Sequence, residues 1–93
     1  MDKKYWKTLI NIVDIIDKKC KIIGLKNKED KFIICTDIYD DEIQPKLEKI
    51  CSKNGLDFDY STIQFQKKKQ KHNSPIVEVP AVQYIFFVKG DIV

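Results

Sequence analysis

The sequence predicts an α+β fold with a four-stranded, mainly antiparallel sheet, two helices on one sheet face and the element order α-β-β-α-β-β. Two segments, 5–20 and 43–53, repeat their apolar residues at helical spacing. Four segments have the apolar, β-branched or alternating character of strands: 21–25, 31–36, 57–69 and 82–88. With 93 residues, 43% of them hydrophobic, the chain suits a single domain, residues 1–93, around one core.

The first helix is predicted from an apolar stripe that begins at Tyr5. Asp2 suits the N-cap position, where a carboxylate accepts hydrogen bonds from free N–H groups. Trp6 and Ile10 widen the stripe on one flank and Ile15 lies beyond the other, so the face is wider than packing on one sheet surface requires. This surplus indicates a second contact surface. The stripe consists of Tyr5, Leu9, Ile12, Val13, Ile16 and Cys20.

A β-hairpin follows, formed by segments 21–25 and 31–36 with a charged turn over 26–30. The second strand of this hairpin is apolar at consecutive positions. Such a strand has both faces at least partly covered, so we expect it inside the sheet.

The second helix is predicted over 43–53, with Pro45 in its first turn and Gly55 ending it. Acidic residues gather just before this helix, at positions 37–42. Carboxylates there cap N–H groups and complement the helix dipole. They could also bind Mg²⁺ or Ca²⁺, but their spacing lacks the alternating ligands and central glycine of an EF-hand loop. We therefore predict no metal site.

The last two strands have different patterns. In segment 57–69 the apolar residues change parity near Ser61 and Thr62, which predicts either a β-bulge or a strand that starts late. Segment 82–88 is apolar on both faces and belongs in the sheet centre. If it pairs with segment 31–36 there, it separates 31–36 from 57–69, and the helix at 43–53 crosses between two parallel strands. This order is a split βαβ element.

The run 64–75 is dense in lysine and follows a strand whose alternation ends there. Ammonium groups cannot be buried unpaired on both faces, so we predict a projecting hairpin arm over 66–79. The arm could dock on an acidic protein surface, attract phosphate, or remain solvated and discourage edge-to-edge aggregation. Its candidate partner-binding residues are Lys67, Lys68, Lys69, Lys71 and His72.

No catalytic or cofactor signature accompanies these elements. The three cysteines, Cys20, Cys35 and Cys51, lack a C-x-x-C pair and are predicted to be reduced thiols. His72 is the single histidine, and no glycine-rich loop is present that could cradle phosphate. The sequence therefore predicts a protein that is not an enzyme, with no catalytic, cofactor-binding or metal-binding residue.

The leading functional hypothesis is a small protein-binding protein of the inhibitor or immunity-protein type, which masks a surface of a larger partner. Its candidate contacts are the lysine-rich arm and an aromatic anchor formed by Tyr5 and Trp6, which could instead close the end of the core. The alternative is a nucleic-acid-binding module that uses hairpin 64–75. A net charge of only +3 and the absence of arginine count against sequence-specific duplex recognition.

Three further expectations concern the oligomeric state, the cellular location and the origin of the protein. One helical layer leaves the second sheet face to be covered, which favours a homodimer. No apolar segment reaches the roughly 20 residues that span a bilayer, and no secretory signal is evident, so we expect no membrane association and a cytoplasmic location. The lysine- and isoleucine-rich composition is compatible with a phage or another mobile element.

Overall fold

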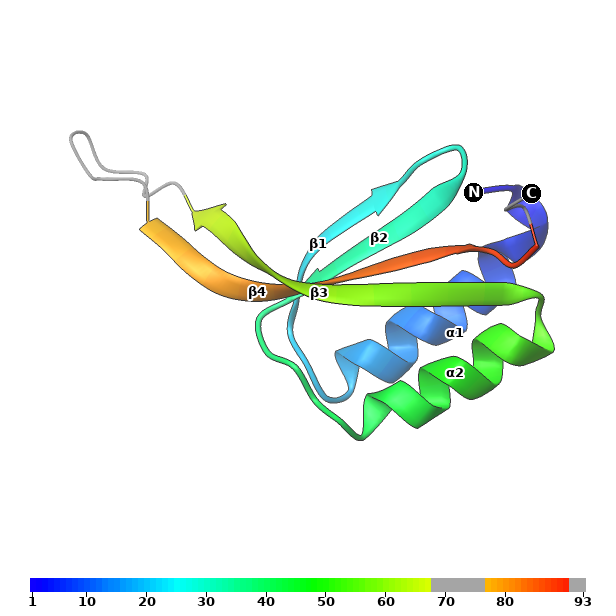
Figure 1. The fold of residues 1–93 in the computed structure, drawn as a ribbon, viewed down its shortest axis with the longest axis horizontal. Coiled ribbons are helices and arrows are strands. Elements are labelled where there is room, and N and C mark those ends of the chain that lie inside the picture. Colours follow the sequence, from blue (N-terminus) through cyan, green and yellow to red (C-terminus); the bar gives the residue numbers. More distant parts are fainter. Residues whose placement is uncertain (68–76, 91–93) are drawn as a thin grey trace.

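The computed structural model describes residues 1–67 and 77–90 and has the predicted α+β architecture (Figure 1). Two helices and a four-stranded sheet follow one another in the order α-β-β-α-β-β. The elements are a 3₁₀ turn η1 (Lys3–Tyr5), α1 (Trp6–Asp17), β1 (Ile22–Asn27), β2 (Lys31–Thr36), α2 (Ile43–Lys53), β3 (Leu56–Lys67) and β4 (Val77–Val88).

Local signals set the helix ends. The side chain of Asp2 accepts a hydrogen bond from the backbone N–H of Lys4 at 3.2 Å, and η1 leads directly into α1. Helix α2 has the predicted bounds. After it, Gly55 adopts a φ of 72°, in the left-handed region that favours glycine, and the chain turns there into β3.

The sheet order is β1-β2-β4-β3, with every neighbouring pair antiparallel. Because β2 and β3 are both antiparallel to β4, they are parallel to each other, and α2 connects them. This arrangement confirms the predicted split βαβ element. The last strand of the chain thus lies between two strands that precede it in sequence.

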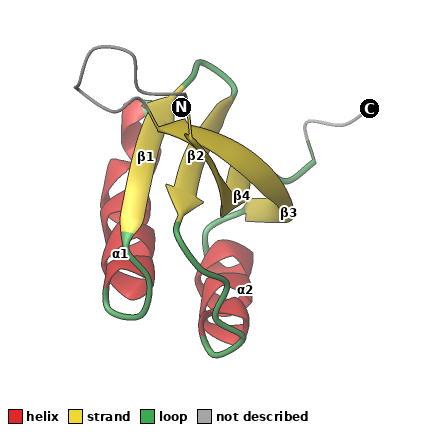
Figure 2. Cartoon of the chain, turned by 90° about the vertical axis from the view of Figure 1, so that its left-hand side faces the viewer, coloured by secondary structure: helices red, strands yellow, loops and turns green. Residues whose placement is uncertain are grey.

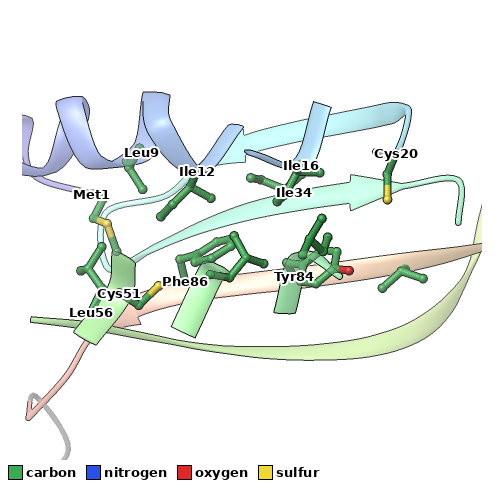
Figure 3. Packing of buried hydrophobic residues seen from close by; sticks show 13 residues of the cluster. Met1, Leu9, Ile12, Ile16, Cys20, Ile34, Cys51, Leu56, Tyr84 and Phe86 are labelled. Carbon is green, nitrogen blue, oxygen red and sulfur yellow. The ribbon is translucent and has the colours of Figure 1, made fainter. Parts of the chain in front are cut away.

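Both helices lie on one side of the sheet, with α1 beneath β1 (Figure 2). We call this side the covered face. Tyr84 and Phe86 of β4 point from it towards α1 and are almost fully buried, as is Ile34 of β2 (Figure 3). The core cluster consists of Met1, Leu9, Ile12, Ile16, Cys20, Ile34, Ile43, Leu47, Cys51, Leu56, Val82, Tyr84 and Phe86.

The predicted bulge near Ser61 and Thr62 is wrong, and so is the alternative of a strand that starts late, because β3 begins at Leu56. Strands β3 and β4 pair without a register shift along the whole length of β3, and the register shifts instead in β1, between Ile22 and Gly24. The change of parity in β3 arises because a different face of the strand is buried in its second half. Phe58 and Tyr60 lie on the covered face, whereas Ile63 is partly buried on the opposite face.

The described part of the predicted arm is a two-stranded ladder. Strand β2 ends at Thr36, opposite Val82, whereas β3 and β4 continue to pair as far as Lys67 and Val77 (Figure 1). The tip of the arm, residues 68–76, lies outside the described residues.

Replacement of Phe86 by alanine tests the importance of the central strand. Phe86 is fully buried, so Phe86→Ala should lower the free energy of unfolding by about 3–5 kcal/mol through lost burial and a residual cavity. Urea unfolding followed by circular dichroism measures the change. The control Leu25→Ala removes a side chain that is 54% exposed and should cost less than about 1 kcal/mol. Equal losses for both variants would contradict the assignment of the core.

Candidate functional site

An apolar groove of about 340 Å³ lies between α1 and the first hairpin, and we call it the α1–β1 groove. Four side chains of α1 form one wall, and one residue each from β1 and β2 forms the other. The lining residues are Trp6, Leu9, Ile10, Val13, Asn27 and Phe32.

The groove exists because the apolar stripe of α1 is wider than the part of it that the sheet covers. Leu9 is buried and Val13 packs against the core, so the inner side of the stripe is used in folding. On the outer side, Trp6 is 51% and Ile10 is 67% exposed. The ammonium group of Lys3 lies 5.9 Å from the centre of the Trp6 ring, within the range of a cation–π interaction.

The groove carries little polar chemistry. Asn27 contributes its only polar side chain, and the Oδ1 atom of Asn27 accepts a hydrogen bond from the N-terminal ammonium group of Met1 at 2.6 Å. Small-molecule sites usually hold several convergent polar groups that orient the ligand. An apolar hollow without them is better suited to the apolar side chains of a protein.

The structure separates the two predicted aromatic contacts. Trp6 lines the groove, whereas Tyr5 does not and instead packs partly buried against the core. Tyr5 has its own cation, because the Lys4 ammonium group lies 5.1 Å from its ring centre. Lys67 is the last residue of β3. The other candidate residues of the arm, Lys68, Lys69, Lys71 and His72, lie outside the described residues.

A second hollow, of about 280 Å³, lies between the helices and was not predicted. Its apolar floor comes from Ile15 of α1 and Ile50 of α2, and three lysines of α2 surround it: Lys46, Lys49 and Lys53. These lysines are three and four positions apart, which places them on one side of the helix. That spacing is the sequence signal that could have identified them.

The thiols are poorly suited to nucleophilic chemistry. Burial, with a smaller contribution from Asp57, raises the pKa of Cys51 to about 11. Burial also raises the pKa of Cys20 and of Cys35. Since the thiolate is the reactive form, these thiols are mainly protonated at neutral pH and react more slowly than a thiol of ordinary pKa.

An aromatic cluster occupies the end of the covered face near the loop that precedes α2. The rings of Tyr39 and Tyr60 stack with their centres 5.3 Å apart. Hydrogen bonding to the neighbouring Tyr60 hydroxyl, together with partial desolvation, raises the pKa of Tyr39 to about 12. Burial raises the pKa of Tyr84, whose hydroxyl has no hydrogen-bond partner among the described residues.

Within residues 1–67 and 77–90, no group of three or more histidine, cysteine, aspartate or glutamate side chains is placed to hold a metal ion. Neither helix in this part of the chain combines the length and apolar character needed to cross a membrane.

Comparison with known proteins adds no relative: no protein-family model, no curated protein and no solved structure matches the chain.

The raised pKa values predict a loss of stability in alkali. A pKa that is higher in the folded protein favours folding below the unfolded value and loses this contribution as pH rises through the folded value. The free energy of unfolding should therefore fall between about pH 9 and pH 11 through Cys51, and between about pH 10 and pH 12 through Tyr39. Urea titrations at a series of pH values measure this dependence.

The variant Cys51→Ala isolates the thiol contribution. It should be less stable than the parent at pH 7, because it leaves a small cavity, but should lose less stability between pH 9 and pH 11. Identical pH slopes for variant and parent would show that the Cys51 thiol does not titrate as proposed.

Proposed function

We propose that this protein binds a larger protein partner through the α1–β1 groove and masks the surface it contacts, as an inhibitor or immunity protein does. One observation carries the proposal: a half-exposed tryptophan and a two-thirds-exposed isoleucine stand at the mouth of an apolar groove.

The placement of Trp6 supports this function on energetic grounds. Tryptophan is among the residues most enriched in interface hot spots, especially where it fills or borders a desolvated pocket. Trp6 stands on the first turn of α1 beside Lys3, so the helix sets the position of its backbone before a partner binds. An anchor on a helix loses less backbone freedom on binding than one on a flexible loop.

Lysines near the groove favour an acidic partner surface. Lys3 and Lys7 lie within one helical turn of Trp6, and Lys28 directly follows Asn27. The two ion pairs in the described chain involve Lys18 and Lys19, so Lys3, Lys7 and Lys28 form no ion pair there. Charges at the rim of an interface chiefly raise the association rate and exclude partners of like charge.

The nucleic-acid alternative depends on hairpin 64–75. The lysine side chains of this hairpin lie outside the region whose side chains the structure describes, and nothing within that region favours nucleic acid over protein. The hairpin therefore enters the test of function as a separate variant.

Capture of a partner from the native host tests the proposal. The double variant Trp6→Ala with Ile10→Ala should reduce capture at least about tenfold, because it removes both exposed anchors of the groove. The matched control Ile38→Ala truncates another isoleucine that is 52% exposed, outside the groove, and should leave capture unchanged. A third variant changes Lys67, Lys68, Lys69 and Lys71 to glutamate and reports on the arm.

Fluorescence gives an independent readout, because Trp6 is the only tryptophan of the chain. Addition of the captured partner should shift the Trp6 emission to shorter wavelength as the ring leaves water. Full capture by the groove double variant would contradict the proposal. So would partner binding that leaves the Trp6 emission of the parent unchanged.

A further inference from the structure

Both helices lie on one side of the sheet, and we call the side that faces away from them the open face (Figure 2). The open face carries an apolar strip. Ile33 of β2 and Ile85 and Phe87 of β4 lie on it, because they alternate with residues that point into the core. All three are partly buried, yet none belongs to the core cluster or packs against it. No described element covers them.

Charged residues border this strip, with lysines on the β1–β2 side of the sheet and aspartates on β3. Lys26 of β1 pairs with Ile33, which pairs with Ile85, which pairs with Asp59 of β3. One row across the open face therefore runs from a lysine through two isoleucines to an aspartate. The next row has the same order of charges, because Phe87 of β4 lies between Lys31 of β2 and Asp57 of β3.

This asymmetry has a consequence for packing two identical sheets face to face. A two-fold axis parallel to the strands places the β1 edge of one copy over the β3 edge of the other. Lys26 of the first copy then faces Asp59 of the second copy. At the other edge, Asp59 of the first copy faces Lys26 of the second. A two-fold axis across the strands would instead place lysine over lysine and aspartate over aspartate. The charges favour the first arrangement.

We propose that the open face is the interface of a homodimer, in which two sheets pack around a two-fold axis parallel to their strands. The apolar strips form the centre of the interface and the Lys26–Asp59 pairs form its two rims. The sheets would lie about 10 Å apart, as in other face-to-face packings. Because the helices remain outside, the α1–β1 groove of each copy stays accessible to a partner.

A charge-reversal cycle tests this arrangement by light scattering over a range of protein concentrations. The parent should reach twice the chain mass of 11.0 kDa. Lys26→Asp alone and Asp59→Lys alone should each raise the dissociation constant about tenfold, because each creates two like-charge contacts. The double variant restores opposite charges and should return within about threefold of the parent.

The rescue cannot arise within one chain. Lys26 and Asp59 lie on strands three positions apart in the sheet, a separation of about 14 Å. Recovery in the double variant therefore reports a contact between two copies. Failure of the double variant to recover would overturn the proposed axis.

Two apolar variants locate the interface. Ile85→Lys should leave a monomer at every concentration measured, with circular dichroism verifying that it is folded. Ile10→Lys, in the α1–β1 groove, should keep the mass of the parent. A parent that stays at the chain mass throughout, a dimer that survives Ile85→Lys, or a dimer lost through Ile10→Lys would each overturn the inference.

Discussion

The structure depends on one constraint: two short helices can cover only one face of a four-stranded sheet. The core therefore forms between the helices and the covered face, where Tyr84, Phe86 and Ile34 are almost fully buried. Hydrophobic burial is the dominant favourable term in folding, and in this chain it is concentrated on one side. Insertion of β4 between β2 and β3 places Tyr84 and Phe86, the largest fully buried side chains, at the middle of that side.

The same constraint accounts for the two surfaces that remain. Helix α1 has a wider apolar stripe than the sheet can cover, so Trp6 and Ile10 border a groove. The second face of the sheet keeps an apolar strip between edges of opposite charge. The two surfaces lie on different sides of the molecule, so dimerisation and partner binding are compatible. We propose the groove as the site of partner binding and the open face as the site of dimerisation.

Local and repetitive signals made much of the fold predictable. Pro45 and Gly55 bracket α2, and the two-sided strands 31–36 and 82–88 indicated the sheet order. The bulge was misplaced because a change of apolar parity has two explanations, an extra residue or a change in which face is buried. The helical spacing of apolar residues predicted that Trp6 would lie on an exposed flank of α1. The other wall of the groove was not predictable, because only tertiary packing brings Asn27 and Phe32 beside α1.

The native cysteines give the most direct test of a sheet covered on one face. Cys35 lies on the open face and is partly buried, whereas Cys20 is 4% and Cys51 is 2% exposed. Brief alkylation of dilute, folded protein, followed by mass spectrometry of its peptides, measures the three rates in one sample. We expect Cys35 to be modified first, with Cys20 and Cys51 protected until the protein unfolds. Modification of Cys51 or Cys20 as fast as Cys35 would contradict the account.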